Sequence, residues 1–475
     1  MRGLRPLTAA GARRRTEALL LAFVVLITVG GHACVGLSMT GELPAELPKF
    51  AISMTLLALV GHLAVRRFAA YADPLVLPLT FLLSGIGLVL LARLDPTYLE
   101  RWPKAGTTAP NQLLWTVVGT AACIGILMLL RDHRHLQRFI YITMLVALAL
   151  LTAPVFFGAD MYGAKRWIII GGQSLQPGEF VKIMISVFFA GYLVVHRDSL
   201  SLTGRKLLGM RLPPMRQLGP IITVWIISLL VLVFERDLGT SLIFFGVFVV
   251  MLYVATERTS WIVCGLLMAA LGAFVVGSTE PHVKGRVAAW LDPLAIYLPP
   301  EQRPPGMVSD QSAQALFSFG SGGITGTGLG QGHPELIGFA GRSDFILTTV
   351  GEELGLAGVM VVLVLYALLV QRGLRMALGA RDPFGKLLAV GLSAALALQV
   401  FVVAGGVTGL IPLTGKALPF LAKGGSSLVA NWIMVALLLR ISDSAERQRE
   451  ADARGPVETT ITPVVAAASA SGAQR

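Results

Sequence analysis

Long runs of apolar residues, separated by short polar turns, make up most of the chain. Each run comes near or exceeds the roughly 20 residues that an α-helix needs to cross the hydrocarbon core of a bilayer. The runs lie at 17–37, 47–66, 74–93, 111–130, 138–157, 177–196, 219–234, 239–255, 260–277, 345–370, 385–411 and 419–440. The run at 219–234 is short and could form a broken hairpin with the next one. The pattern predicts an all-α polytopic membrane protein with about 12 transmembrane helices.

The composition supports this fold class. Hydrophobic residues make up 55% of the chain, charged residues only 14%, and the mean hydropathy is +0.72. The formal net charge of +12 could indicate a nucleic-acid partner, but the bases are scattered over short loops. Membrane topology and anionic lipid headgroups explain these bases without nucleic acid. The three cysteines fall inside apolar runs, which supports neither a disulfide framework nor a metal cluster.

Lys and Arg gather in alternate loops, and this bias sets the orientation in the membrane. The basic clusters are Arg13 to Arg15, Arg66-Arg67, the turn from Arg131, the loop from Arg197 to Arg216, and Arg372 to Arg381. We therefore expect both termini to be cytoplasmic, and 158–176 and 278–344 to lie outside. The predicted organisation is a basic cytoplasmic N-terminus at 1–16, two membrane helices within 17–70, a working unit at 74–441 that includes the extracytoplasmic loop 278–344, and a disordered cytoplasmic tail at 442–475.

The polar segment from Glu280 to Glu353 is too long to be a mere connector, because loops of more than about 15 residues are usually functional or disordered. Its stretch 313–332 reads AQALFSFGSGGITGTGLGQG, which predicts a helix or re-entrant segment followed by tight glycine turns. The segment returns to the membrane at Asp344. Asp344 is our candidate catalytic base, although an acid at this position could instead cap the following helix.

Two pairs of charged residues flank the run that begins at 177. Lys165 and Arg166 precede Trp167, a pattern that fits either a membrane-surface anchor or a clamp for phosphate. Glu179 and Lys182 are three residues apart on one face of the predicted helix. They could form a structural ion pair or line a substrate cavity.

Three later segments carry further polar residues. Arg236 could meet an anionic ligand, while its neighbour Asp237 could cap the next helix. Arg286 could contact lipid headgroups or belong to an anion site. The Gly- and Pro-rich stretch that ends in Ser426-Ser427 predicts a helix break, which either lines a ligand site or forms a packing turn.

The order of these motifs is informative. They read RWIIIGG, QPGEFVK, ERDLGT, KGRVAAWLDP, QSAQALFSFGSGGITGTGLG, SDFILTTVGEELGLAG and IPLTGKALPFLAKGGSS. Over 74–441 the chain resembles the SEDS family of peptidoglycan polymerases, the RodA/FtsW group, and is more similar to RodA. That family has a ten-helix core, so residues 1–70 would add two helices. The chain departs from the usual pattern at Gly178, Arg342, Ala422 and Lys423.

The resemblance implies an inverting glycosyltransferase at the outer face of the cytoplasmic membrane. It would polymerise lipid II, an undecaprenyl-diphosphate-linked precursor, into glycan strands for cell elongation and shape. A class B penicillin-binding protein would be its transpeptidase partner. In this resemblance Asp344 matches the family's catalytic aspartate. Glu179 and Lys182 match its paired glutamate and lysine, and Arg166 and Arg286 match two of its basic residues. We group Lys165, Arg236, Ser426 and Ser427 with them as candidate substrate contacts.

Two hypotheses from other functional classes are alternatives to the polymerase. A flippase for the same lipid would need a charged path through the bilayer, whereas the polar motifs here concentrate at the outer boundary. A non-catalytic scaffold for cell-wall enzymes would not need an intact Asp344. A divalent cation could assist with the diphosphate, but the sequence offers no ligand cluster for one.

Overall fold

The computed structural model describes residues 9–103, 106–161, 164–201 and 237–453, with a few short pieces between 206 and 230. In this part of the chain, eleven helices are long and apolar enough to cross a membrane. They are α1 (Ala9–Thr40), α2 (Leu47–Phe68), α3 (Val76–Arg101), α4 (Ala109–Leu129), α5 (Ile140–Phe157), α6 (Gly178–Ser201), α8 (Leu238–Thr256), α9 (Thr259–Thr279), α13 (Gly355–Gly379), α14 (Pro383–Val407) and α15 (Gly425–Ala453). The all-α polytopic fold is confirmed. The predicted run at 219–234 lies largely outside the described residues.

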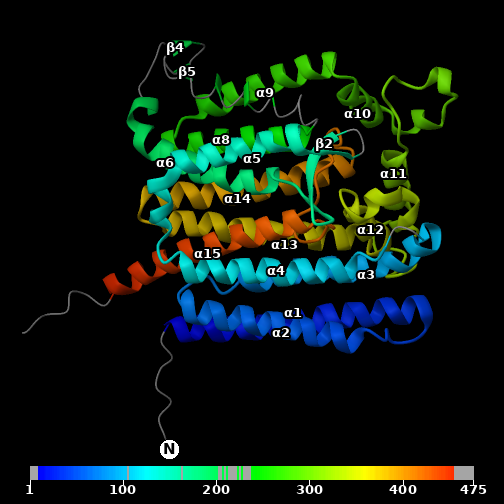
Figure 1. Cartoon of the computed structure of the whole chain (residues 1–475), viewed down its shortest axis with the longest axis horizontal. Coiled ribbons are helices and arrows are strands. Elements are labelled where there is room, and N and C mark those ends of the chain that lie inside the picture. Colours follow the sequence, from blue (N-terminus) through cyan, green and yellow to red (C-terminus); the bar gives the residue numbers. More distant parts are fainter. Residues whose placement is uncertain are drawn as a thin grey trace, which may run out of the picture.

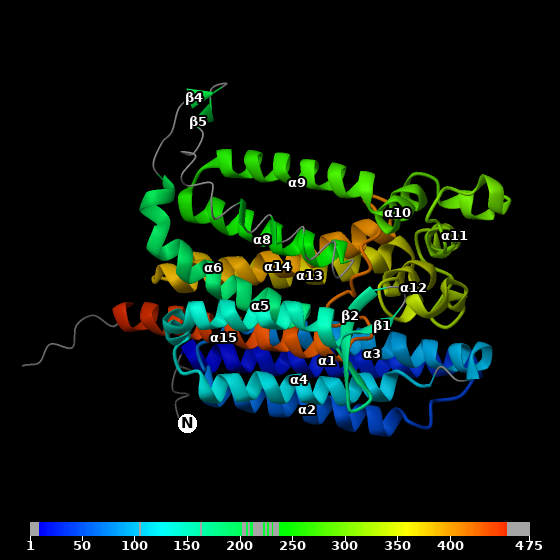
Figure 2. The same cartoon turned by 45° about the horizontal axis from the view of Figure 1, so that its top comes forward.

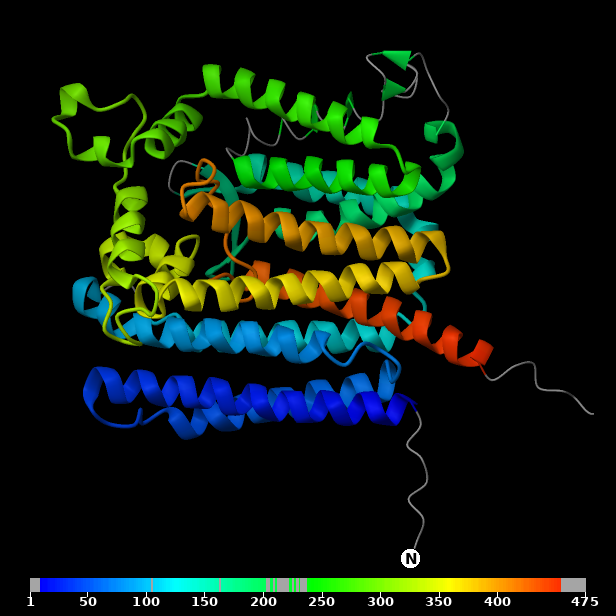
Figure 3. The same ribbon diagram turned by 180° about the vertical axis from the view of Figure 1, so that it is seen from behind.

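The long helices run roughly along one direction and form a layered bundle (Figure 1). Helices α14 and α15 lie in its middle, and the α1–α2 pair forms one edge beside α3 and α4 (Figures 1 and 3). The most hydrophobic stretches of α14 and α15 are 83% and 89% buried, against 28% for α1. The start of α1 and the end of α15 lie at the same end of the bundle, and the opposite end carries the shorter elements (Figure 2).

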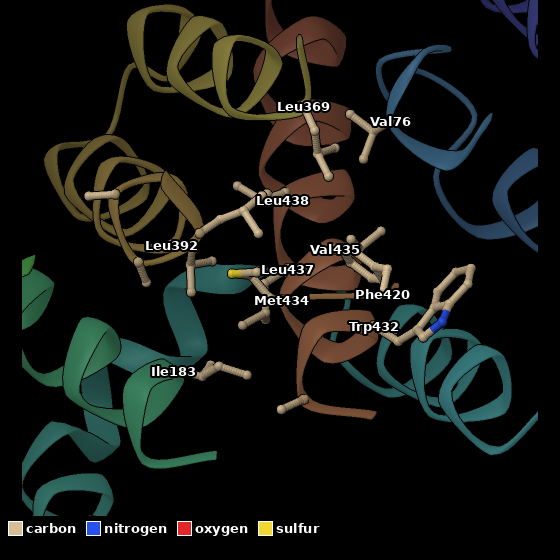
Figure 4. Close-up of a cluster of buried hydrophobic side chains, with 14 of the residues drawn as sticks. Val76, Ile183, Leu369, Leu392, Phe420, Trp432, Met434, Val435, Leu437 and Leu438 are labelled. Atoms are coloured by element: carbon tan, nitrogen blue, oxygen red, sulfur yellow. The ribbon is translucent and has the colours of Figure 1, made fainter. Parts of the chain in front are cut away.

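Helix α15 is the centre of the core. Its labelled side chains, among them Trp432, Val435 and Leu438, point outward to several neighbouring helices (Figure 4). Small residues allow close approach, as is usual between membrane helices. A Cβ at Gly119 of α4 would lie only 2.5 Å from Cδ1 of Trp432, so the indole packs directly on the α4 backbone. A Cβ at Gly87 of α3 would similarly lie 2.6 Å from the carbonyl oxygen of Leu421.

A small sheet, which the sequence analysis did not predict, lies at the end of the bundle opposite the termini. Strands β1 (Ala159–Met161), β2 (Ala164–Ile170) and β3 (Gln173–Leu175) pair antiparallel in chain order. The turn between β2 and β3 is Gly171-Gly172, with φ of +58° and +80°. Two consecutive positive φ values are what a tight two-residue hairpin requires. A second hairpin, β4 (Lys206–Leu207) with β5 (Met210–Arg211), lies at the other end.

The polar segment after α9 folds into short helices and turns. These are α10 (Pro281–Leu291), η4 (Pro293–Tyr297), η5 (Pro300–Gln302), α11 (Gln311–Gly322), η6 (Pro334–Arg342) and α12 (Ile346–Glu353). The prediction of a helix followed by glycine turns is confirmed, because Gly323, Gly326, Gly328 and Gly330 all have positive φ.

Several predicted boundaries were wrong. The run at 345–370 is not one helix: α12 ends at Glu353 and α13 starts at Gly355, whose φ of +67° breaks the helical path. The backbone of Gly323 and Ile324 occupies this break, accepting hydrogen bonds of 2.9 and 3.1 Å from Leu356 and Ala357.

The terminal boundaries also shift. Helix α1 begins at Ala9, inside the predicted basic N-terminus 1–16. Helix α15 starts at Gly425 and continues to Ala453, so the tail predicted as disordered from 442 is helical over its first part. The extension is held by contacts: Ser442 and Asp443 accept hydrogen bonds of 3.0 and 2.9 Å from the backbone of Asp73 and Tyr71.

Candidate active site

Asp344 lies in the connection between η6 and α12, half-buried. Ser343 Oγ donates a 2.9 Å hydrogen bond to its Oδ1. Helix α12 is preceded by Phe345 and has no side-chain cap, so the capping alternative for Asp344 was wrong. Burial raises the pKa of Asp344, and the Ser343 hydroxyl and the guanidinium groups of Arg166 and Arg286 oppose that rise.

Three of the predicted site residues converge on Gly415. A Cβ at Gly415 would lie 3.4 Å from Arg286 Nη2, 3.7 Å from Arg166 Nη1 and 3.9 Å from Asp344 Oδ2. Gly415 has a φ of +71°, a conformation that favours glycine. The loop after α14 therefore places bare backbone where a carboxylate and two guanidinium groups meet.

Arg166 comes from strand β2 and is buried. Its guanidinium lies over the ring of Trp167, 4.7 Å from the centroid, and 3.9 Å from Asp237 Oδ2. Its Nε and Nη1 are buried without a hydrogen-bond partner among the described residues. Buried donors usually have partners, so an arginine with two spare donors is suited to bind an anion.

Arg286 comes from α10 and faces Arg166 across the same point. Its Nη1 donates a 3.1 Å hydrogen bond to the carbonyl oxygen of Thr414, which fixes the guanidinium beside the Gly415 turn. Burial lowers the pKa of Arg286, and the neighbouring Arg166 lowers it further. Two like charges held this close favour a ligand with at least two negative charges.

Glu179 and Lys182 form the predicted ion pair at the start of α6, with 2.8 Å between Lys182 Nζ and Glu179 Oε2. Both side chains are buried. Lys182 also donates to Gln399 Oε1 at 2.7 Å and Asn431 Oδ1 at 2.9 Å, and Ser427 Oγ donates to Glu179 Oε2 at 3.2 Å. The pair is thus hydrogen-bonded to α14 and α15, which stabilises two charges inside the bundle.

Lys416 is a buried charged residue of this network that the sequence analysis did not single out. Its Nζ lies 2.9 Å from Glu179 Oε1 and 3.8 Å from Asp237 Oδ2, and it donates to Thr240 Oγ1 at 3.1 Å. Burial alone would lower the pKa of Lys416, but the carboxylates of Glu179 and Asp237 outweigh it and raise the pKa. No local signal in the sequence separates Lys416 from the rest of the Gly- and Pro-rich stretch.

Asp237 caps α8, as the sequence predicted, accepting a 2.9 Å hydrogen bond from the backbone N–H of Thr240. Burial would raise the pKa of Asp237, but Lys416 and Arg166 lower it below its ordinary value. Asp237 is therefore an ionised link between Arg166 and the network formed by Glu179, Lys182 and Lys416.

The remaining candidate substrate contacts are Ser426, Lys165 and Arg236. Ser426 Oγ accepts a 3.0 Å hydrogen bond from the backbone of Gln176 and donates to Ser174 O at 3.3 Å, so it joins α15 to the small sheet. Arg236 and the side chain of Lys165 lie outside the described residues.

Arg342 and Lys423, two residues that differ from the usual family pattern, lie together in a separate cluster. Arg342 is buried, lies over the ring of Tyr98 at 4.4 Å from its centroid, and sits 3.4 Å from Asp95 Oδ1. Its carbonyl oxygen accepts a 2.9 Å hydrogen bond from the backbone N–H of Lys423. The cluster joins η6 to α3 and to the loop before α15, and so fixes the segment that carries Asp344.

Comparison with known proteins decides the family. Residues 73–447 match the family of FtsW, RodA and SpoVE, described as cell cycle protein. The chain belongs to this family, the SEDS proteins.

Similar proteins cover nearly the whole chain. The peptidoglycan glycosyltransferase RodA of Mycobacterium tuberculosis is 45% identical over 438 residues, 92% of each chain, and that of Mycobacterium leprae is 44% identical over 91% of each. A probable peptidoglycan glycosyltransferase FtsW of Geobacter metallireducens is 34% identical over 70% of this chain and 84% of its own.

Solved structures show the same fold. A chain from a peptidoglycan synthase complex, studied for its coordination of polymerization and crosslinking, aligns with a TM-score of 0.60 at 23% identity, over 79% of this chain and 98% of its own. The rod shape determining protein RodA of Thermus thermophilus aligns with a TM-score of 0.53 at 21% identity, over 78% of this chain and 96% of its own.

Proposed function

We propose that this SEDS protein is a peptidoglycan glycosyltransferase that polymerises lipid II into glycan strands. The observation that carries the proposal is the meeting of Asp344, Arg166 and Arg286 around Gly415. A carboxylate beside two guanidinium groups offers a proton acceptor and an anion site in one place. The similarity to RodA glycosyltransferases over 92% of the chain supports it.

Asp344 acts as the general base in this proposal. It takes the proton of the acceptor sugar's 4-hydroxyl while that oxygen forms a bond to the anomeric carbon of the donor. The bond from that carbon to the lipid diphosphate breaks, and the diphosphate leaves with the electron pair. Because one displacement occurs, the anomeric configuration inverts. The raised pKa of Asp344 makes it a stronger base than an ordinary aspartate.

Arg166 and Arg286 stabilise the charge that develops on the departing diphosphate. Their guanidinium groups are fixed by Trp167 and Thr414, so little reorganisation is needed during the reaction. The Nε and Nη1 atoms of Arg166, which make no hydrogen bond to the described residues, are the donors available for phosphate oxygens. We extend the proposal to Lys165 and Arg236 as further cations for the same group.

The network of Glu179, Lys182 and Lys416 stabilises this site by connecting it to the core helices. Lys416 lies next to Gly415 in the chain and bonds to Glu179, so it fixes the turn on which the site converges. Glu179, Lys182, Ser426 and Ser427 are proposed as polar groups at the inner boundary of the substrate site. In the described structure, however, all four bond to protein groups.

We place the site outside the cytoplasm, with both termini inside. The small sheet and α10–α12 lie at one end of the bundle, and the termini with Arg13 and Arg66 lie at the other (Figures 1 and 2). The proposed topology has twelve spans, with 219–234 as the twelfth. Two of them lie within 17–70, and ten belong to a polymerase core at 74–441.

The proposed partner is a class B penicillin-binding protein, with a role in cell elongation and shape. Support comes from the structural similarity to a chain of a peptidoglycan synthase complex and the higher identity to RodA than to FtsW proteins. Among the described residues no group of three or more His, Cys, Asp or Glu could hold a metal. A divalent cation that assists with the diphosphate stays a prediction.

The test is polymerisation of purified lipid II by the full-length protein, with and without the transpeptidase. Formation of glycan chains, resolved by gel after the lipid is released, is the expected result. A flippase would instead move fluorescent lipid II across vesicle membranes without forming polymer, and a scaffold would do neither. Either of those outcomes contradicts the proposal.

A further inference from the structure

A cavity of about 470 Å³ lies between α1 and α2, at the end of the bundle that carries the termini. Its lining includes Arg14, Arg15, His62 and Arg66. Every residue that lines it precedes residue 73, where the match to the SEDS family begins. The cavity is therefore separate from the site around Gly415 and from the part of the chain that the family shares.

The cavity carries excess positive charge. Arg14 is 5% exposed and forms an ion pair with Glu17, whose other oxygen lies 2.8 Å from Nδ1 of His62. Both carboxylate oxygens of Glu17 are thus already in contact with Arg14 and His62. Arg15 and Arg66 are exposed, and no ion pair or hydrogen bond of their side chains is found among the described residues. The Nε of Arg14 is buried and also has no partner there.

Two acids near this end, Glu446 and Asp443, are engaged elsewhere. Glu446 is paired with Arg13 at 2.7 Å. Asp443 lies 3.5 Å from Arg440 and 3.0 Å from Arg447. In the part of the chain that the structure describes, no ion pair links Arg15 or Arg66, which both line the cavity, to a carboxylate. Two unpaired guanidinium groups around a cavity of this size suit a phosphate-bearing ligand.

The surroundings favour a lipid as the source of that phosphate. Helices α1 and α2 form an edge of the bundle, and Leu19, Leu59 and Leu63 are exposed apolar side chains on them. Acyl chains could lie along these residues while the headgroup enters the cavity. Basic pockets between membrane helices at the cytoplasmic surface are known to take anionic headgroups.

We propose that the cavity between α1 and α2 binds the phosphate headgroup of an anionic phospholipid through Arg15 and Arg66. A bound lipid would join the start of α1 to the end of α2. The site adds a lipid contact to the two N-terminal helices and is independent of the glycosyltransferase proposal.

The test measures lipid binding to the purified full-length protein by native mass spectrometry. Phosphatidylglycerol and phosphatidylcholine of equal chain length are titrated in a neutral detergent. We expect one phosphatidylglycerol molecule to bind tightly to each protein, and no phosphatidylcholine molecule to bind with similar affinity. Arg15→Gln with Arg66→Gln should weaken that binding by about 25-fold, since each base near a headgroup contributes roughly fivefold.

Arg67→Gln is the matched control. Arg67 is the exposed neighbour of Arg66, lies over the ring of Phe68 and does not line the cavity. We expect its replacement to leave the tight lipid in place. An equal loss in Arg66→Gln and Arg67→Gln would show general surface attraction and overturn the proposal.

A second experiment tests whether inorganic phosphate binds at the same cavity. Phosphate is added to protein in phosphatidylcholine alone, and thermal stability is followed in the wild type and in the double variant. No stabilisation at millimolar phosphate is the expected result. Stabilisation that depends on Arg15 and Arg66 would instead identify a soluble phosphate ligand and overturn the lipid assignment.

Discussion

Lys416 Nζ lies 2.9 Å from Glu179 Oε1, so the loop that carries Gly415 is bonded to the first turn of α6. This contact connects the two parts of the proposed site. On one side are the Glu179–Lys182 pair and the core helices, and on the other is the turn where Asp344 and the two arginines meet.

Lys416→Met should remove this connection. Glu179 and Asp237 would each lose a cationic neighbour while buried, which typically destabilises a protein by about 3 kcal/mol or more. We expect a lower thermal unfolding temperature and a loss of polymerase activity. Lys423→Met is the control, because Lys423 is an exposed lysine in the same connection before α15. Similar losses in both variants would show that charge alone, and not the buried contact, matters.

The Glu179–Lys182 pair can be tested by single and double replacement. Lys182→Ala leaves Glu179 with Lys416 as its remaining cation, so we expect lower stability and activity. Glu179→Gln with Lys182→Met removes both charges but also deprives Lys416 of a carboxylate. Stability should therefore recover only in part, and activity should stay low. Normal polymer in every variant would mean that the pair has no role in the reaction.

Gly415→Ala probes the point where the site converges. A methyl group there would contact Arg286, Arg166 and Asp344, and an alanine at a φ of +71° costs roughly 1–2 kcal/mol. Gly409→Ala is the matched control, because Gly409 has a φ of +77° and open space around its Cβ position.

Both alanine variants should lose similar thermal stability, but only Gly415→Ala should lose lipid II polymerisation. The measurement compares polymer yield at a temperature where both are folded. Equal activity in the two variants would show that the space beside Gly415 is not used by substrate.

The sequence predicted the spans well, because hydropathy over about 20 residues is a strong local signal. It did not predict the break at Gly355, since the apolar run continues through it and the break depends on a turn formed by Gly323 and Ile324. The β2–β3 hairpin was missed for a similar reason. Ile168 to Ile170 are apolar enough to suggest a membrane boundary, and only the Gly171-Gly172 pair signals a turn.

The site residues came from motifs that are far apart in the chain. For Arg166, Arg286 and Asp344 the sequence also allowed a purely structural role, as a membrane-surface anchor, a headgroup contact or a helix cap. Their spacing in the chain could not show that they meet at Gly415. The resemblance supplied their roles. Lys416 was passed over as part of a Gly- and Pro-rich break, because nothing local indicates that its side chain turns inward to Glu179 and Asp237.

The environment of Asp344 predicts how stability changes with pH. Burial raises its pKa above the ordinary 3.8, so the folded protein holds this proton more tightly than the unfolded chain does. Stability should therefore fall as pH rises through the folded pKa. At neutral pH Asp344→Asn should raise the unfolding temperature, and the gain should shrink as pH is lowered toward 3.8.

Asp237→Asn gives the opposite sign and serves as the comparison. Lys416 and Arg166 lower the pKa of Asp237, so its contribution to stability is present above 3.8 and lost as pH falls through the lower folded value. This replacement should lower the unfolding temperature at neutral pH. The same direction of change in both variants would contradict the opposite environments of the two acids.

The catalytic role of Asp344 is tested by the activity of the same variant. Asp344→Asn preserves size and can keep the contact with Ser343, yet it cannot accept the proton of the sugar hydroxyl. Since Asp344 does not cap α12, loss of a cap cannot account for a drop in activity. We expect polymerisation of lipid II to fall by about 10² or more, the usual contribution of a general base. The assay uses equal amounts of folded protein, at a temperature where both the variant and the wild type are folded. Near-normal polymer would end the assignment and direct attention to Glu335 or Glu352, whose Oε2 atoms are buried without a partner among the described residues.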